Sequence, residues 1–270
     1  MLRDKEKNLN IPVVILCGGK GTRLSEETVS KPKPMVEIGG MPILWHIMKS
    51  YSSYGFNRFI LALGYKGEYI KQYFYNLRIT SSDFSLKLNP KYDIEYLNHS
   101  NENNWEITFV DTGEETLKGG RIKRVEKYIN NDTFLLTYGD GVCDVNLNKL
   151  VEFHKSHDCI GTVTAVRPPS RFGELQIDEE NTVMGLEEKP QMGKGLINGG
   201  FFVLDKKVLS YLTDNEDCDF EFGPLQQISR DKQLKAFIHD GFWQCMDNIR
   251  ERDYLERQVK DKTAPWIIWE

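Results

Sequence analysis

A buried strand that runs directly into glycines is the feature that most constrains this chain. Five apolar residues, Val13 to Cys17, precede Gly18, Gly19 and Gly21. An uninterrupted apolar run of this length predicts a buried strand, and the glycines predict a loop at its end. Because glycine has no Cβ, backbone N–H groups in such a loop can approach an anionic ligand closely. The stretch therefore predicts a buried strand that ends in a phosphate-binding loop.

The loop matches neither of two common phosphate-binding patterns. It lacks the Gly-Lys-Ser/Thr of a Walker A loop, and Leu24 stands where the dinucleotide fingerprint has its third glycine. One alternative is that the glycines serve turn geometry alone. Against it, Arg23 and Lys33 add positive charge that suits a phosphate. Pro32 and Pro34 fix the backbone around Lys33, so we expect that segment to be non-helical.

The motif Gly-Gly-x-Gly-Thr-Arg-Leu, followed by Pro-Lys-Pro, resembles the signature of the sugar-1-phosphate nucleotidyltransferases. Within that family the chain is most similar to the glucose-1-phosphate cytidylyltransferases. The segments that carry this narrower resemblance are Met35–Met48, Tyr138–Gly141, Arg171–Gly173, Glu188–Pro190, Asn198–Phe202, Gly241–Gln244 and Ala264–Trp266. The resemblance covers almost the whole chain from residue 11 onward.

Composition agrees with an ordinary globular protein. The 270 residues are 40% hydrophobic and 28% charged, with a formal net charge of −5. This balance argues against nucleic acid as a partner. The number of cysteines, five, is odd and no Cys-x-x-Cys occurs, so we expect reduced thiols and a cytoplasmic location rather than disulfides or zinc. We expect no signal peptide and no membrane partner, because the first ten residues are polar and no apolar run approaches the length of a transmembrane helix.

Alternating strand and helix patterns predict the architecture. Strands are expected at residues 11–17, 58–63, 105–110, 133–138, 159–166, 175–177, 182–188, 197–204 and 234–239. Helices are expected after Pro42 and at 67–75, 119–129, 145–157, within 220–229 and at 248–260. The first half predicts a mostly parallel sheet with helices on both faces, and the second half extends it as a mixed sheet.

We therefore predict one Rossmann-like α/β domain over residues 11–262, with small β excursions, preceded by an extension at 1–10. The resemblance implies a GT-A-like nucleotidyltransferase fold. Its nucleotide-binding half would be 11–165 and its sugar-binding half 166–262. Residues 76–104 are expected to form an excursion with short strands, which is a plausible oligomer contact.

Individual residues on the helices admit two interpretations. His46 is either a substrate contact or a plain helix-face residue. The apolar and aromatic stripe of the 67–75 helix is expected to face the core, and its members are Tyr69, Ile70, Tyr73 and Phe74.

The resemblance implies transfer of a cytidylyl group from CTP to glucose 1-phosphate. The attacking sugar phosphate is already an anion, so no activated nucleophile is needed, and catalysis reduces to positioning and charge stabilisation. Oxygen ligands suit Mg²⁺, the expected cofactor. Asp140, at the end of a central strand, is the first candidate ligand. Asp247 could be a loop or cap residue by itself, and the resemblance pairs it with Asp140.

The resemblance also assigns the remaining roles. Arg23 and Lys33 would be catalytic. The residues implied to bind the nucleotide are Leu16, Gly18, Gly19, Gly21, Thr22, Arg23, Thr116, Arg121 and Gly139. The residues implied to bind the sugar phosphate are Lys189, Asn198, Gly199, Arg171 and Glu221. Without the resemblance, Lys189 would be interpreted as a solvated lysine beside a turn proline.

Two positions depart from the family pattern. Lys118 stands where a threonine is usual, and would either point to solvent or contact a phosphate. Asn248 replaces a threonine beside Asp247. Three alternatives therefore stay open: a different phosphorylated acceptor, UTP or dTTP as donor, or a non-catalytic module that binds a nucleotide sugar. The resemblance further implies a homo-oligomer and a place in nucleotide-sugar synthesis for surface polysaccharides.

Overall fold

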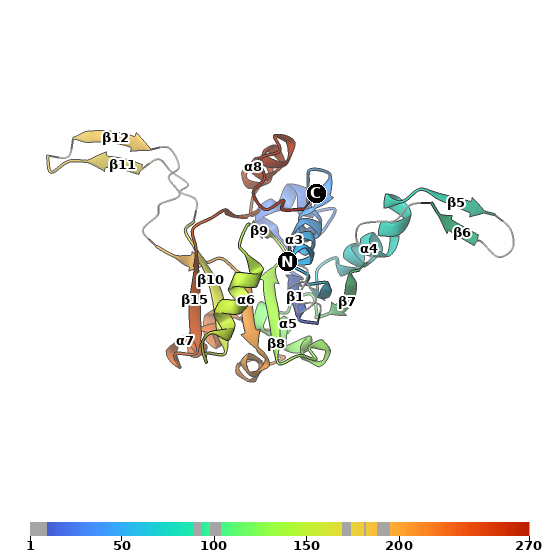
Figure 1. Cartoon of the computed structure of the whole chain (residues 1–270), viewed down its shortest axis with the longest axis horizontal. Coiled ribbons are helices and arrows are strands. Elements are labelled where there is room, and N and C mark those ends of the chain that lie inside the picture. Colours follow the sequence, from blue (N-terminus) through green and yellow to red (C-terminus); the bar gives the residue numbers. More distant parts are fainter. Residues whose placement is uncertain are drawn as a thin grey trace.

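The structure is a computed structural model, which describes residues 10–88, 93–97, 104–168, 174–180, 182–187 and 195–269. One eight-stranded sheet runs through the body of the molecule (Figure 1). Its strands are β1 (Pro12–Cys17), β4 (Arg58–Leu63), β7 (Glu106–Asp111), β8 (Thr133–Tyr138), β10 (Gly161–Val166), β13 (Ile197–Asn198), β14 (Phe202–Asp205) and β15 (Leu234–His239).

The sheet is parallel in its first half and mixed in its second. The order is β13-β10-β14-β8-β1-β4-β7, and β15 pairs with β10. Strands β8, β1, β4 and β7 are parallel neighbours. Strand β14 is antiparallel to both β8 and β10, so it joins the two halves. The predicted α/β class and the single sheet across both halves are confirmed.

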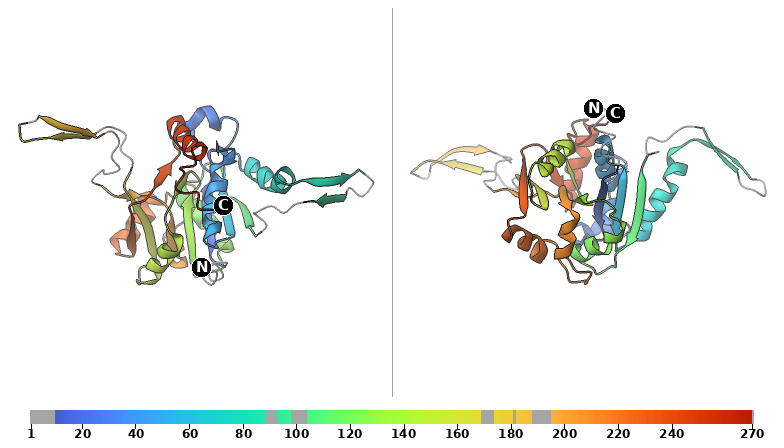
Figure 2. Two further views of the ribbon diagram at one scale, coloured as in Figure 1. Left: turned by 45° about the horizontal axis from the view of Figure 1, so that its top comes forward. Right: turned by 60° about the horizontal axis from the view of Figure 1, so that its bottom comes forward.

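Helices cover both faces of the sheet (Figure 2). They are α2 (Ser25–Thr28), α3 (Ile43–Ser53), α4 (Gly67–Ser81), α5 (Lys118–Arg124), α6 (Leu147–Lys155), α7 (Gln226–Arg230) and α8 (Ile249–Lys260). Strand β1 shows why both faces need cover, because all six of its residues are buried. Alternate side chains point to opposite faces of a strand, so β1 contributes to two separate cores.

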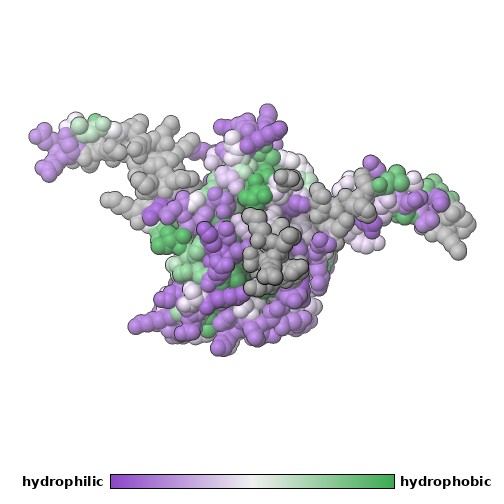
Figure 3. Space-filling model, in the orientation of Figure 1, coloured by the Kyte–Doolittle hydropathy of each residue, from purple (hydrophilic) through white to green (hydrophobic). Residues whose placement is uncertain are grey.

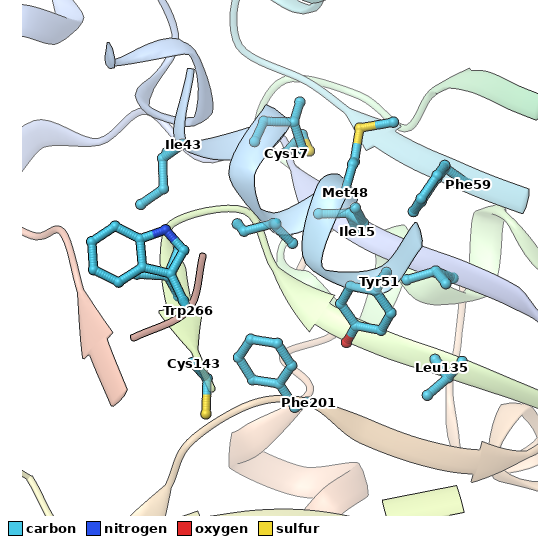
Figure 4. Packing of buried hydrophobic residues seen from close by; sticks show 14 of the residues in the cluster. Ile15, Cys17, Ile43, Met48, Tyr51, Phe59, Leu135, Cys143, Phe201 and Trp266 are labelled. Atoms are coloured by element: carbon cyan, nitrogen blue, oxygen red, sulfur yellow. The ribbon is translucent and has the colours of Figure 1, made fainter. Parts of the chain in front are cut away.

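The larger core lies between the sheet and α3. Ile15 and Cys17 lie beside Met48 and Tyr51 of α3 (Figure 4). The C-terminal segment closes this core with Trp266, which is fully buried. On the other face, Val14 and Leu16 of β1 pack with Ile122 of α5. Phe202 and Leu204 of β14 belong to the same core. Burial of β1 on both sides fixes the position of the loop that follows it.

His46 belongs to this core and not to a substrate site. It is 3% exposed, its Nε2 lies 2.8 Å from the carbonyl oxygen of Ile38, and its Nδ1 accepts from the Trp266 indole at 3.4 Å. Burial lowers its pKa, which keeps the ring neutral at physiological pH. The helix-face interpretation is therefore the correct one.

Two β hairpins extend from the body (Figure 1). One pairs β5 (Phe84–Lys87) with β6 (Asp93–Tyr96), and the other pairs β11 (Glu174–Ile177) with β12 (Val183–Glu187). The short-strand excursion predicted for residues 76–104 is confirmed in part. The predicted start of this excursion was wrong, because α4 continues through Ser81 instead of ending at residue 75.

Other element boundaries also differ from the predictions. The strand expected at 197–204 is broken in two by Gly200, whose φ is +77°, a conformation that interrupts a strand. Helix α6 (Leu147–Lys155) is shorter than predicted at both ends, and it begins late because Asn146 caps it, accepting a hydrogen bond from the Lys149 N–H at 3.0 Å. The prediction that the apolar and aromatic stripe of α4 faces the core is only partly correct, because Ile70 is buried but Tyr69 is 39% exposed.

The surface in Figure 3 is mostly hydrophilic over the body of the molecule. Among the described helices, none has both the length and the apolarity needed to cross a membrane.

Candidate active site

The glycine loop leaves the carboxyl end of β1 and lines a pocket of about 300 Å³. Its turn is closed by the Leu24 N–H, which donates to the Gly21 carbonyl at 2.9 Å. The loop contributes Gly18, Gly19, Gly21, Thr22 and Arg23 to the lining. Leu16 and Gly139 complete the same wall, and their backbones are joined by a 3.0 Å hydrogen bond. We call this the loop pocket.

Arg121 holds the loop in place from behind. Its guanidinium is buried at 4% exposure and donates to the carbonyl of Gly18 at 3.0 Å. Its other acceptors are the carbonyl oxygens of Leu63, Gly113 and Glu114 and the hydroxyl of Thr112. Burial, with the nearby Arg124 charge, lowers its pKa below the ordinary arginine value. The donors that were predicted to reach a nucleotide are therefore used by the chain itself.

Thr116 is similarly engaged. It is 3% exposed, and its hydroxyl accepts a 2.7 Å hydrogen bond from Arg124. Thr116 and Arg121 both border the loop pocket, and their side chains join the surrounding loops together.

Lys33 lies at the floor of the loop pocket. The prolines around it were predicted to prevent a helix, and that was wrong: Lys33–Met35 forms one 3-10 turn. Pro34 sits in the first turn, where a missing N–H has no cost, and the Met35 N–H donates to the Pro32 carbonyl at 2.8 Å. This turn directs the Lys33 side chain inward, where it is 11% exposed.

Asp140 and Asp247 meet at the Lys33 ammonium. Strands β9 (Gly141–Cys143) and β16 (Trp243–Cys245) pair side by side, and the Met246 N–H donates to the Asp140 carbonyl at 2.8 Å. The Lys33 Nζ lies 2.5 Å from Asp140 Oδ2 and 2.6 Å from Asp247 Oδ1. Burial alone lowers the pKa of Lys33, but the two carboxylates outweigh it and hold the pKa above its usual value.

The two carboxylates fit a divalent cation. Oxygen atoms from two separate segments converge on one positively charged point, the Lys33 nitrogen. Oxygen donors of this kind, from one or two carboxylates with room for phosphates beside them, suit Mg²⁺. The pairing of Asp140 with Asp247 that the sequence could not derive by itself is thus present in the fold.

A second pocket, of about 320 Å³, opens on the other side of Asp140. We call it the acceptor-side pocket. The residues that line both pockets are Arg23, Lys118, Tyr138 and Asp140. Arg23 reaches across this junction and donates to Asp247 Oδ2 at 2.9 Å. The carboxylate pair therefore stands between two cavities, each large enough for part of a ligand.

Three predicted sugar-side residues line the acceptor-side pocket: Asn198, Gly199 and Glu221. The other two, Arg171 and Lys189, lie outside the described residues. The sequence interpretation assigned no role to Tyr138, which donates to Glu221 Oε1 at 2.5 Å and accepts from the Asn198 amide at 3.0 Å. The position of Tyr138 at the end of β8, two residues before Asp140, was the sequence feature that could have indicated a role in the site.

Trp243 was also missed. It lines the acceptor-side pocket, and its indole N–H donates to the carbonyl of Gly199 at 2.7 Å. Gly199 itself has no room for a side chain, because a Cβ there would lie 2.8 Å from a methyl group of Val166.

The two departures from the family pattern have clear positions. Asn248 caps α8, and its side chain accepts from the Glu251 N–H at 3.0 Å. Lys118 lines both pockets with a side chain that is 40% exposed, and its ammonium is 2.6 Å from Glu221 Oε2.

Comparison with known proteins defines the class of enzyme. Residues 12–249 match the family described as nucleotidyl transferase, and the chain belongs to this family. Among curated relatives, it is 48% identical to the glucose-1-phosphate cytidylyltransferase of Salmonella typhi, over 95% of this chain and 99% of that protein. It is 42% identical to the probable glucose-1-phosphate cytidylyltransferase of Bacillus subtilis, over 95% of this chain and 99% of the relative.

Solved structures agree on the fold. HddC from Yersinia pseudotuberculosis, in a complex with GMP-PN, superposes with a TM-score of 0.66 at 28% identity. The match covers 92% of this chain and 99% of HddC. The protein is therefore a nucleotidyltransferase with the sheet architecture of that family.

Proposed function

We propose that the protein transfers a cytidylyl group from CTP to glucose 1-phosphate, producing CDP-glucose and pyrophosphate. The observation that carries this proposal is the convergence of Lys33, Asp140 and Asp247 at the junction of two pockets. A reaction that joins two phosphorylated substrates needs a concentrated charge site between them. The choice of CTP and glucose 1-phosphate rests on the Salmonella and Bacillus relatives.

The loop pocket is assigned to CTP. Backbone N–H groups of Gly18, Gly19 and Gly21 would face the phosphates, and Thr22 and Arg23 would add a hydroxyl and a guanidinium at the pocket edge. Arg121 and Thr116 would act through the loops that they hold together. On this assignment residues 11–165 form the nucleotide half of the domain and residues 166–262 the sugar half.

The acceptor-side pocket is assigned to glucose 1-phosphate. Asn198, the Gly199 backbone and Glu221 would hydrogen-bond the sugar hydroxyls. Lys189 would neutralise the sugar phosphate, and Arg171 would assist on the same side. Asp140 lines this pocket, so an acceptor bound there would have its phosphate near the junction.

The chemistry follows from this placement. A phosphate oxygen of the sugar attacks the α-phosphorus of CTP in line, the new O–P bond forms, and the bond to pyrophosphate breaks. The nucleophile is already ionised, so no general base is required. Lys33 and Arg23, both at the junction, would stabilise the negative charge that the two substrates bring together.

We propose Mg²⁺ as the divalent cation of this family's chemistry, held by Asp140 and Asp247. When bound it would supply Lewis-acid stabilisation of the phosphate oxygens. Lys33 would then share the two carboxylates with the cation.

Two broader assignments accompany the enzyme activity. We propose a cytoplasmic enzyme of nucleotide-sugar synthesis for surface polysaccharides; all five cysteines, which lie in the described part, are free thiols. We also propose a homo-oligomer, with the two protruding hairpins as contact surfaces (Figure 1). Light scattering of the purified protein tests the second assignment, and a monomeric mass would contradict it.

Pyrophosphate release with Mg²⁺ and glucose 1-phosphate tests the reaction. The nucleotides CTP, UTP, dTTP, ATP and GTP are supplied in separate assays. Release with CTP alone is expected. Release with UTP or dTTP in its place would keep the chemistry and change the donor. If no nucleotide gives release, the assay is repeated with CTP and other sugar phosphates. If these also give no release, the protein is a non-catalytic module that binds a nucleotide sugar.

A further inference from the structure

Lys118 connects the two halves of the active site. It is the first residue of α5, in the nucleotide half, and it lines both pockets. Its ammonium lies 2.6 Å from Oε2 of Glu221, a residue of the sugar half, and 5.8 Å from the centre of the Tyr138 ring. The ion pair therefore crosses the boundary at which the two substrates are proposed to meet.

Glu221 is held at its other oxygen by an ordered chain of hydrogen bonds. The Tyr138 hydroxyl donates to Oε1 at 2.5 Å, and the Asn198 amide donates to the same hydroxyl at 3.0 Å. Burial and the neighbouring Glu221 carboxylate raise the pKa of Tyr138, so the phenol keeps its proton. This chain fixes the plane of the Glu221 carboxylate.

The oxygen that faces Lys118 retains hydrogen-bonding capacity. Glu221 Oε2 is buried but has no hydrogen bond, because the Lys118 ammonium stands close to it without the alignment that a hydrogen bond requires. The Lys118 side chain is 40% exposed and flexible, so its ammonium can move aside and remain paired. A hydroxyl that enters the acceptor-side pocket would then share Oε2 with the ammonium, because a carboxylate oxygen can accept more than one hydrogen bond.

We propose that Lys118 is a positioning residue that holds Glu221 in the orientation in which Oε2 also accepts a hydroxyl of the acceptor sugar. The inference rests on the proposed function, because it assumes a sugar phosphate in the acceptor-side pocket. Lys118 supplies the counter-charge for a carboxylate whose side chain is only 21% exposed.

Steady-state kinetics on variants test the role. Lys118→Met is expected to raise the KM for glucose 1-phosphate by about tenfold or more, the order of one hydrogen bond to a charged group. The KM for CTP should stay within about twofold, because the Lys118 ammonium is paired with Glu221 on the acceptor side. Lys118→Arg keeps the charge and should recover most of the wild-type KM. The control is Lys123→Met, which removes an ammonium of the same helix that pairs with Glu126, outside both pockets.

Coupling between the two residues provides a sharper test. Glu221→Gln should raise the same KM, and the double variant with Lys118→Met should lose no more than Glu221→Gln alone. With monodeoxy analogues of glucose 1-phosphate, the analogue that lacks the bonded hydroxyl should bind wild type and Lys118→Met equally. A purely structural role for Lys118 would weaken all analogues alike.

Calorimetric binding of glucose 1-phosphate, which needs no turnover, separates this inference from the proposed reaction. A wild-type protein that binds the sugar phosphate but releases no pyrophosphate would contradict the reaction only. Equal binding by wild type and Lys118→Met would overturn the role of Lys118 only. A raised KM for CTP with an unchanged KM for the acceptor would also overturn it, and would move Lys118 to the nucleotide phosphates.

Discussion

The loop pocket and the acceptor-side pocket meet at Asp140, but they are built in different ways. One wall of the loop pocket is a continuous piece of chain, the end of β1 and the glycines that follow it. The acceptor-side pocket is assembled from side chains of β8, the β13–β14 turn, β16 and the segment around Glu221. The first is therefore visible in the sequence as a motif, and the second exists only after folding.

The junction between the pockets should give the largest effect. Asp140→Asn and Asp247→Asn each remove a carboxylate that lies within 2.6 Å of Lys33 but keep the side-chain volume. We expect kcat to fall by about 100- to 1000-fold, comparable to the loss of one preorganised charge-stabilising group. Pyrophosphate release measures the rate, and circular dichroism checks that the fold is retained.

A matched control for these variants is Asp240→Asn. The Asp240 side chain is 72% exposed and pairs with Arg167 at 3.4 Å, so its loss should leave kcat unchanged. If Asp140→Asn also kept wild-type turnover, the junction would not be the reacting centre. The assignment of the two pockets to two substrates that meet at Asp140 would then be wrong.

The two arginines of the loop pocket should respond differently. In Arg121→Lys, an ammonium cannot reach all the acceptors that the guanidinium satisfies, which include the partly buried carbonyls of Gly113 and Glu114. A polar group that is buried and left without a partner costs about 1–3 kcal/mol. We expect a Tm several degrees lower by calorimetry. Arg23→Lys, at a side chain that is 75% exposed, should keep the Tm and lose rate. An unchanged Tm in Arg121→Lys would show that Arg121 does not organise the loop.

Two adjacent glycines of the loop should also differ in whether a substitution affects stability or nucleotide binding. A Cβ on Gly18 would lie 2.2 Å from Arg121 Nη1, whereas a Cβ on Gly19 would meet nothing within 4 Å. Gly18→Ala should therefore destabilise the protein by about 1–3 kcal/mol, the usual cost of overpacking. Gly19→Ala should change stability by less than about 0.5 kcal/mol and act only on the KM for nucleotide. Chemical denaturation of the pair measures the difference, and equal losses would refute it.

The contrast between a continuous motif and a site assembled by folding also explains which elements could be predicted from the sequence. Strands β4 and β8 were predicted at their observed bounds, because continuous apolar runs between turn residues specify buried strands without tertiary information. The break at Gly200 and the extension of α4 were not predicted, because glycine is tolerated in strands and polar residues are tolerated in exposed helices.

At the site too, local sequence indicates some residues and leaves others undetected. Lys33 and Asp140 could be selected from their local sequence, since each follows a recognisable strand or loop. The approach of Asp247 to Asp140 depends on the pairing of β9 with β16, which no local pattern encodes. Tyr138 and Trp243 look like ordinary core aromatics in sequence, and only their hydrogen bonds to Glu221 and Gly199 show that they shape a pocket.

The smallest predicted effect concerns the turn that carries Glu221. The Asp219 carboxylate accepts hydrogen bonds from the N–H groups of Glu221 at 2.9 Å and Phe222 at 3.1 Å. Burial raises the pKa of Asp219, but these hydrogen bonds and the Lys118 charge outweigh it, so the pKa lies below its ordinary value. A carboxyl with a lowered pKa in the folded state stabilises the protein above the unfolded pKa of about 3.9, and that stabilisation is lost as the pH falls further.

Asp219→Asn keeps an oxygen acceptor for both N–H groups and removes the titrating group. We expect almost the wild-type Tm at neutral pH and a shallower fall in Tm from about pH 5 to about pH 3, the range in which an unfolded aspartate takes up its proton. Thermal unfolding across this range measures it. Parallel curves for variant and wild type would mean that the acceptor-side turn is held by geometry alone, without a contribution from the Asp219 charge.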